Sequence, residues 1–272
     1  MAEEFEDLQE GARAASIEQF HFVHLDEAQG IARVTLDRAP ANVLSVDLMQ
    51  ELVATLEALE YRRETKLVIL QGAGKYFSAG FELGEHLGDR AYLMLEGFRG
   101  VFEAMAKLDK PTLAVVNGPA LGAGSILAAA CDIVLAGQSA KFGHPEIRGG
   151  VFNTVAASLL PRLVGRKRAY EMLLLGVSLT AADAERIGLI TRAVPDDRLE
   201  AETATLVQRF QESSAPVMQM ARRAIAGGLD LPFAEAVRHS EDVYLNSLLA
   251  TQDVEEGLRA VAEKRRPAWK DR

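Results

Sequence analysis

The strongest structural signal lies near the middle of the chain, in the stretch Thr112-Leu113-Ala114-Val115-Val116-Asn117-Gly118-Pro119-Ala120-Leu121-Gly122-Ala123-Gly124-Ser125. The apolar run 112–116 predicts a buried strand, and a helix is expected from about Leu121. Small residues between them allow a ligand to approach backbone N–H groups, and a helix start favours an anion or a developing oxyanion. The same pattern also fits plain close packing of a helix on a sheet, so this turn alone is only a candidate site.

Around this stretch the chain alternates strand and helix patterns, and a second glycine-bearing turn, Phe77-Ser78-Ala79-Gly80-Phe81-Glu82-Leu83, follows another apolar run. Strands are expected at 20–24, 31–36, 66–72, 112–116, 133–136, 140–142 and 190–194. Helices are expected at 45–62, 92–108, 153–164, 166–175, 181–187, 196–212, 215–226, 232–249 and 251–262. The pattern predicts an α/β body followed by helices that either close the same domain or pair with another subunit.

Three parts of the chain are distinguished by composition. Residues 1–18 are predicted to be a mobile acidic leader, residues 19–200 an α/β core, and residues 201–272 a helical region. Thr180, with Asp183 three residues later, resembles a capping-box helix start.

Charge and composition exclude several classes of protein. The 272 residues carry a formal net charge of −9, which disfavours nucleic acid and anionic membranes as partners. Cys131 is the single cysteine, so no intrachain disulfide can form. The first residues are acidic, unlike a signal or transit peptide, and we expect a cytoplasmic protein. Residues 111–131 carry no charge, but their prolines and glycines favour a strand, a turn and a buried helix over a membrane span.

Sequence motifs for nucleotides and metals are missing. Gly122-Ala123-Gly124 lacks the third glycine of a dinucleotide-binding turn, and no Gly-Lys-Ser/Thr follows a glycine loop. The histidines are scattered, and no pattern typical of a zinc site occurs. We therefore expect neither a metal nor a separate cofactor.

The chain resembles the crotonase (enoyl-CoA hydratase/isomerase) superfamily over about residues 18–272. The resemblance rests on the runs Phe77–Leu83, Asn117–Asp132 and Ala140-Lys141-Phe142-Gly143-His144-Pro145-Glu146-Ile147, in this order. It is supported by Leu160–Gly165, Ala182–Ile190 and Glu256–Arg265. It implies a spiral of β-β-α turns with a C-terminal helical trimerisation region, and a homotrimer that is often paired into a hexamer.

The resemblance also implies an active site that binds an acyl-CoA. By motif position, the backbone amides of Phe81 and Ala123 would hold the thioester oxygen, and Glu146 would be the acid/base. Preformed donors of this kind stabilise the charge that develops on the oxygen. Hydratases of the family carry a second glutamate, and its position here is occupied by Ile126, which cannot transfer a proton.

Several other residues are candidates near these motifs. Glu82 or Glu85 could replace the missing acid, and Ser125 or Asn153 could hold a water. His86 and His144 are expected to be structural or pocket-lining, with direct proton transfer as the alternative. The residues expected to line the substrate and coenzyme A path are Arg38, Ala39, Ala41, Ala79, Gly80, Leu83, His86, Gly122, Ile126, Asn153, Lys264 and Trp269.

The reaction is narrowed by the run Arg148-Gly149-Gly150-Val151-Phe152-Asn153-Thr154-Val155-Ala156-Ala157-Ser158. It resembles the subgroup that hydrates cyclohexa-1,5-diene-1-carbonyl-CoA, as does the ending Trp269–Arg272. The leading hypothesis is therefore a lyase that adds water to a cyclic dienoyl-CoA, with coenzyme A present only as part of the substrate. An enoyl-CoA isomerase that uses the single glutamate is the first alternative, and a non-catalytic acyl-CoA-binding homologue is the second.

Overall fold

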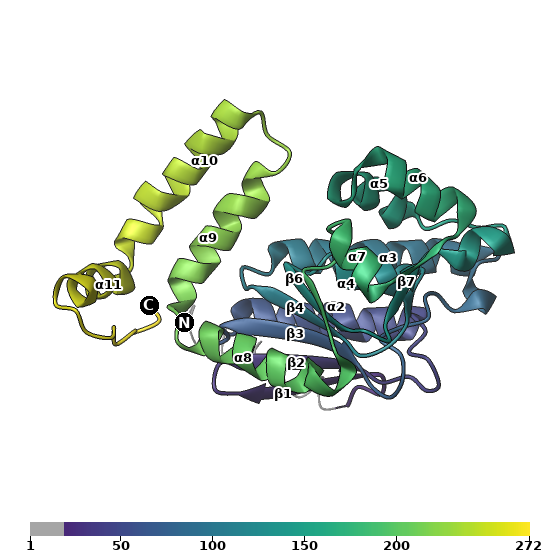
Figure 1. Ribbon diagram of the computed structural model, residues 1–272, viewed down its shortest axis with the longest axis horizontal. Coiled ribbons are helices and arrows are strands. Elements are labelled where there is room, and N and C mark those ends of the chain that lie inside the picture. The colour runs from purple at the N-terminus through teal and green to yellow at the C-terminus, as the bar shows by residue number, and fades with distance from the viewer. Residues whose placement is uncertain (1–18) are drawn as a thin grey trace.

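The computed structural model describes residues 19–272, so the leader predicted for 1–18 lies outside the described residues. A six-stranded sheet in the order β1-β2-β3-β4-β6-β9 forms the centre of the body (Figure 1). Only β1 is antiparallel to its neighbour; each of the other adjacent pairs is parallel. The strands are β1 (Val23–Ala28), β2 (Ile31–Leu36), β3 (Leu67–Gly72), β4 (Thr112–Val116), β6 (Ile133–Gly137) and β9 (Arg192–Val194).

The central strands β3 and β4 are almost entirely apolar, as expected for a sheet that is covered on both faces. In β3, Val68 and Leu70 join the larger core cluster, whereas Leu67 and Ile69 join a smaller cluster on the opposite face. This division follows from the alternation of side chains along a strand. Parallel sheets buried on both sides show such continuous apolar runs.

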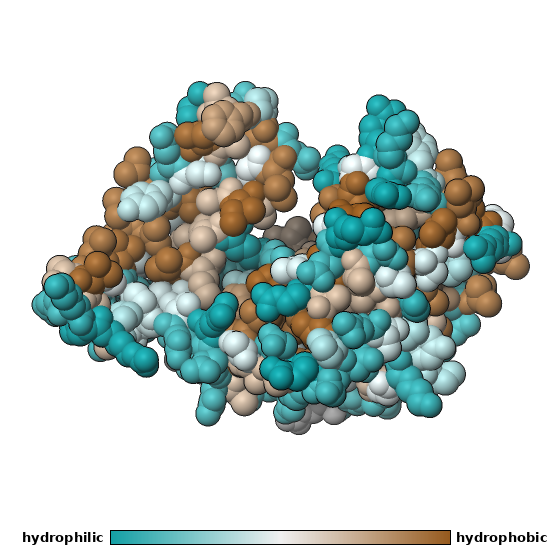
Figure 2. Space-filling view, in the orientation of Figure 1, coloured by the Kyte–Doolittle hydropathy of each residue, from teal (hydrophilic) through white to brown (hydrophobic). Residues whose placement is uncertain are grey.

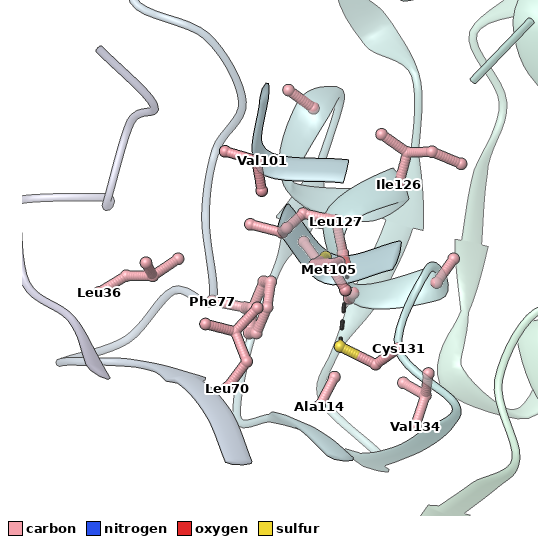
Figure 3. Close-up of a cluster of buried hydrophobic side chains, with 14 of the residues drawn as sticks. Leu36, Leu70, Phe77, Val101, Met105, Ala114, Ile126, Leu127, Cys131 and Val134 are labelled. Carbon is pink, nitrogen blue, oxygen red and sulfur yellow. Dashed lines mark hydrogen bonds between the residues drawn. The ribbon is translucent and has the colours of Figure 1, made fainter. Parts of the chain in front are cut away.

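Three helices pack their apolar stripes on one face of the sheet: α2 (Val46–Tyr61), α3 (Asp89–Lys107) and α4 (Ala123–Ala129). The Ser45 hydroxyl caps α2 by accepting the Leu48 N–H at 3.2 Å. All residues of α4 are buried, and Figure 3 shows its Leu127 on the side of the helix where Phe77, from the turn after β3, lies. The opposite face is covered by α8 (Leu199–Gln211), whose Leu199, Leu206 and Phe210 lie in or against the smaller cluster.

A second, three-stranded sheet in the order β5-β7-β8 positions the candidate site. It contains β5 (Ala120–Leu121), β7 (Lys141–Gly143) and β8 (Ser178–Thr180), and the short 3₁₀ helix η2 (Pro145–Gly149) follows β7. Because β5 leads directly into α4 and pairs parallel with β7, the start of α4 and η2 leave the same end of this sheet. The helices α5 (Thr154–Leu163), α6 (Gly165–Leu175) and α7 (Ala181–Arg186) follow, and α5 and α6 pack together.

The last helices extend away from the body. Figure 1 shows α9 (Ala215–Gly228) and α10 (Phe233–Asn246) as an antiparallel pair, with α11 (Gln252–Ala262) at the base of the pair, on the side away from the body. We call α9, α10 and α11 the arm. The division between core and helical region predicted at residue 200 falls inside α8, because the apolar side of that helix belongs to the sheet. The arm begins instead at α9, one helix later.

The C-terminal segment 264–272, which we call the strap, runs back along the base of the arm. The buried Asp253 carboxylate accepts the Ser214 hydroxyl at 2.7 Å and the backbone N–H groups of Lys270 and Asp271 at 2.7 and 3.1 Å. Asp271 in turn pairs with Lys66 of the body, with 2.8 Å between Oδ2 and Nζ. The strap therefore ties α11, the start of α9 and the body together.

Most of the predicted elements are confirmed, and the differences lie at short strands and helix ends. The strands β5 and β8 were not predicted, because a strand of two or three residues has too few side chains to show alternation. The helix predicted to start at Tyr92 begins at Asp89, and the one predicted near Leu121 begins at Ala123. The capping of α7 is confirmed, since Thr180 accepts the Asp183 N–H at 3.1 Å.

The uncharged segment 111–131 is divided among β4, β5 and α4, as its prolines and glycines predict. Within residues 19–272, no helix has the length and apolar character needed to cross a membrane.

The buried thiol of Cys131 yields a test of the core. Burial, reinforced by the negative charge of Asp132, raises its pKa from 9.0 to about 12. Because the thiolate is the reactive form, we expect no reaction of Cys131 with a disulfide reagent at pH 8 in the folded protein. Full reaction should follow unfolding in guanidinium, as measured by released chromophore. Rapid labelling at the same pH without denaturant would contradict this packing.

A second test concerns the strap, where Glu256 accepts hydrogen bonds from Arg265 and from the Ala268 N–H. These bonds lower the pKa of Glu256 from 4.5 to about 2. A depressed pKa means that the stabilisation is complete above about pH 4.5 and is lost as the pH falls toward 2. Trp269, the only tryptophan, reports on the strap through its own bond to the Glu212 carbonyl.

We therefore expect Glu256→Gln to shift the Trp269 emission to longer wavelength already at neutral pH, and acid to produce the same shift in the wild type. Glu255→Gln is the matched control, because Glu255 lies on the exposed side of α11 and its ion pair within residues 19–272 is with Arg259. Equal spectra for the Glu256 variant and the wild type across this pH range would show that the pair does not hold the strap.

Candidate active site

The turn after β3 exposes one backbone donor, at Phe81. Leu44 donates to the Gly80 carbonyl at 2.7 Å and accepts the Glu82 N–H at 3.3 Å, so the residues on both sides of Phe81 are engaged. The Phe81 N–H itself donates to no group in residues 19–272. Gly80 has φ +101°, a conformation that side-chain-bearing residues rarely adopt.

A second free donor begins α4, at Ala123. The preceding Gly122 has φ +54° and donates to the Gly143 carbonyl at 2.7 Å, which fixes the helix start against β7. As the first helical residue, Ala123 has no intrahelical acceptor for its N–H. A Cβ on Gly80 would lie 3.5 Å from the Ala123 nitrogen, so the two turns are in contact. The amides predicted from the sequence are therefore brought together.

The carboxylate of Glu146 lies against the same helix start. Its Oε2 is 3.1 Å from the position that a Cβ on Gly122 would occupy. Its Oε1 is 3.1 Å from Nδ1 of His144, and the Glu146 side chain is only 18% exposed. Glu146 does not form a surface ion pair with Arg148, which would be its simplest structural role. The Arg148 guanidinium donates to the Gly176 carbonyl instead.

Unpaired polar atoms gather in these same elements. Buried side-chain atoms without a partner in the described part of the chain include Ser125 Oγ, His144 Nε2, Glu146 Oε2 and Asn153 Nδ2. The Asn153 oxygen caps α5 by accepting the Ala156 N–H at 2.8 Å, so its amide group is held in place. Buried polar groups are normally paired, and a set of unpaired ones indicates a place for water or ligand.

The Phe81 side chain continues into an aromatic row. Its ring meets His86 edge-on at 5.8 Å and Phe98 at 4.7 Å between centroids, and Phe98 meets Phe102 at 4.8 Å. Edge-to-face packing of this kind favours a fixed ring orientation. The aromatic row therefore forms a closely packed surface beside the turn that carries the Phe81 N–H.

The loop expected to contact coenzyme A lies beside the same turn. Ala41 accepts the Ala79 N–H at 2.9 Å, and Arg38 pairs with Glu82 at 2.9 Å between Nη2 and Oε2. Leu83 follows the turn and is 81% exposed. These predicted residues form one continuous surface next to the amide at Phe81.

Glu146 is the carboxylate that remains available among the predicted acids. Glu82 is bound to Arg38, and Glu85 accepts the Val46 N–H at 2.9 Å at the start of α2 and faces Arg90. Ile126 is fully buried, and Figure 3 shows it pointing to the other side of α4 from Leu127.

Two predicted residues lie elsewhere. Lys264 and Trp269 belong to the strap, where Trp269 packs on Gly257, and Figure 1 places α11 at the opposite end of the molecule from β7. One chain therefore does not bring them to Glu146. No cluster of three or more His, Cys, Asp or Glu residues able to hold a metal occurs in residues 19–272.

Sequence reasoning missed the structural role of Glu85 and the contact between Gly122 and Glu146. The pairing of β5 with β7 creates that contact, and two-residue strands leave almost no periodic signal. Glu85 accepts a hydrogen bond from the start of α2, which is distant in the sequence. A contact of this kind also leaves no pattern in the residues next to Glu85 in the chain.

Comparison with known proteins agrees with this arrangement. The family model described as enoyl-CoA hydratase/isomerase matches residues 26–272. A protein of Rhizobium meliloti described as "Probable enoyl-CoA hydratase" is 39% identical over 252 residues, covering 91% of this chain and 98% of that protein. The crystal structure of an enoyl-CoA hydratase from Bacillus anthracis has a TM-score of 0.87 at 30% identity, covering 93% of this chain and 100% of that one.

A Magnetospirillum magneticum structure titled as an enoyl-CoA hydratase/carnithine racemase is also similar, with a TM-score of 0.85 at 30% identity and coverage of 93% and 96%. The sheet topology, the two free amides and the extent of these matches lead to one conclusion. The chain belongs to the enoyl-CoA hydratase/isomerase family and has the crotonase fold.

Proposed function

We propose that this protein adds water to an unsaturated acyl-CoA, and that the acyl group is a cyclic diene. The observation that carries the proposal is the lone Glu146 carboxylate, whose unpaired Oε2 lies against Gly122 beside the free Ala123 amide. A proton-transfer group and two charge-stabilising donors are thus combined at one place. Membership of the family supports the general reaction class, and we extend this class to a cyclic acyl group.

A single carboxylate can complete the hydration of a double bond conjugated with the thioester. Glu146 takes a proton from water while the water oxygen bonds to the β-carbon. The electron pair of the double bond moves toward the thioester oxygen, where the N–H groups of Phe81 and Ala123 stabilise the charge. Protonated Glu146 then returns the same proton to the α-carbon, so the carboxylate is restored and one water has been added.

The water itself needs polar neighbours. Ser125 Oγ and Asn153 Nδ2 are buried and without partners, and Asn153 is fixed by its capping bond. In the proposed mechanism these atoms hold the water that a second glutamate would hold in other hydratases. Ser125 and Asn153 thereby bind the water, which the apolar side chain of Ile126 cannot do.

The cyclic substrate is supported by the apolar side of the site. Phe81 belongs to the aromatic row, and the buried Ile126 stands at the position where the family resemblance places a glutamate. A ring buries its faces against such groups without needing hydrogen bonds. The run 148–158, which resembles the hydratases of cyclic dienes, points to the same class.

Isomerisation is the second candidate, and one observation favours it. With Glu82 and Glu85 bound elsewhere, Glu146 would act alone, and a lone carboxylate can move a proton from the α-carbon to the γ-carbon of a 3-enoyl-CoA. That reaction needs no water and would leave Ser125 and Asn153 unused. A protein that binds acyl-CoA without turnover is the remaining alternative.

We propose that coenzyme A lies along the surface formed by Arg38, Ala41, Ala79 and Leu83, with no other cofactor. Lys264 and Trp269 lie at the far end of the chain, so they can contact the coenzyme only from another subunit. We therefore include a homotrimer, or a hexamer of paired trimers, in the proposal. Its support is the apolar surface of the arm, where Figure 2 shows hydrophobic residues over α9, α10 and α11.

The reaction is tested by offering cyclohexa-1,5-diene-1-carbonyl-CoA, crotonyl-CoA and a 3-enoyl-CoA to the wild type and to Glu146→Gln, with products followed by mass. We expect the gain of one water on the cyclic diene and a fall of about 10²–10⁴-fold in kcat for the variant, since it loses its proton-transfer group. Glu103→Gln, which changes a surface pair with Arg99, is the matched control.

Two outcomes would redirect the assignment. A mass-neutral shift of the double bond in the 3-enoyl-CoA, without hydration of the diene, would make the protein an isomerase. Binding of the thioesters without any turnover would support the non-catalytic alternative. Hydration that survives in Glu146→Gln would remove Glu146 from the mechanism.

The assembly is tested by light scattering coupled to size exclusion. Phe233, the first residue of α10, is 85% exposed, and Leu229 after α9 and Leu245 of α10 are exposed as well. Large apolar residues gathered at an exposed surface mark interaction sites. We expect the mass of three or six chains for the wild type and a smaller mass for Phe233→Glu. A monomer at micromolar concentration would rule out the proposed assembly.

A further inference from the structure

Among residues 19–272, the imidazole of His144 makes the only polar side-chain contact to the carboxylate of the proposed acid/base. Its Nδ1 lies 3.1 Å from Glu146 Oε1, and the His144 side chain is only 1% exposed. The other ring nitrogen, Nε2, is buried without a partner in the described part of the chain. The bond to Glu146 is therefore the single polar contact that this ring makes there.

The chemistry of the two groups fixes the direction of this hydrogen bond. An ionised carboxylate only accepts hydrogen bonds, so Nδ1 must carry the proton that it donates to Oε1. A neutral imidazole then has its acceptor lone pair at Nε2. Oε2 receives nothing from His144 and faces Gly122, beside the Ala123 amide.

We propose that His144 is a positioning residue that engages Oε1 of Glu146 and so presents Oε2 as the oxygen that exchanges protons with the substrate. The proposal rests on the proposed function, because it deepens the role given there to Glu146. It assigns different tasks to the two oxygens of one carboxylate. With no second glutamate to restrict the first, the histidine fixes which oxygen reacts.

The backbone around His144 holds the ring in place. His144 lies between β7 and η2, and the Gly143 carbonyl before it accepts the Gly122 N–H at 2.7 Å. After it, Arg148 of η2 donates to the Gly176 carbonyl that ends α6. The imidazole is therefore anchored on the same backbone segment as the carboxylate, directly after β7, whose partner strand β5 leads to Ala123.

Two substitutions of His144 distinguish a role in positioning Glu146 from a role in filling space. The side-chain amide of His144→Asn can place a donor close to the position of Nδ1, whereas His144→Leu fills the space without a donor. We expect His144→Leu to lower kcat by about 10²-fold, since a misplaced catalytic group can cost this much. KM for the thioester should change little, because the coenzyme surface is untouched. His144→Asn should restore most of the lost kcat.

His24→Asn is the control, because His24 also lies beside a carboxylate, that of Asp37, but at the exposed surface. Its kcat and KM should equal those of the wild type. Circular dichroism and thermal melting of all variants identify any that fail to fold. Wild-type kcat in a folded His144→Leu, or equal losses in the Leu and Asn variants, would overturn the proposal.

A measurement without turnover keeps this inference separate from the proposed reaction. In protein labelled with ¹⁵N-histidine, the signal lost in His144→Asn identifies His144. We expect its Nδ1–H form in the wild type and a return toward the Nε2–H form in Glu146→Ala. If no thioester is turned over but this tautomer change is seen, the pairing stands and the proposed reaction fails. An unchanged tautomer in Glu146→Ala would overturn the pairing itself.

Discussion

The close approach of two backbone turns is the constraint on which the site depends. A Cβ on Gly124 would lie 2.5 Å from the Ser78 carbonyl oxygen, and one on Gly118 would lie 2.0 Å from the Lys75 carbonyl oxygen. Real Cβ atoms do not come this close to backbone, so the segment after β3 and the segment after β4 can touch only through glycine. This contact brings the free amides of Phe81 and Ala123 to one place.

The second sheet adds the acid to these amides. Pairing of β5 with β7 makes the chain before α4 and the chain before η2 neighbours, and the bond from Gly122 to Gly143 fixes their separation. Glu146 is thereby held against Gly122 by backbone geometry. The large, mostly parallel sheet lies between the two core clusters, while the small sheet aligns the residues of the site.

The arm and the strap have a different character. They are joined to the body by polar contacts, such as Lys66 with Asp271 and Arg222 with Asp132 and the Leu108 carbonyl. Many large apolar residues of the arm are exposed in a single chain, including Ile225, Leu245 and Val261, unlike those of the core. The body thus holds the candidate active site, whereas the arm has the kind of surface that suits contacts between chains.

The sequence by itself determined the central strands, the long helices and the residues of the two glycine turns, because burial on both faces and helical periodicity repeat over many residues. It also indicated Glu146 and the absence of a second glutamate at Ile126. Only the tertiary structure decided that Glu82 and Glu85 are engaged elsewhere, that His144 contacts Glu146, and that Lys264 and Trp269 lie far from both. These facts depend on which strand ends become neighbours and where side chains point, and local periodicity carries no information about either.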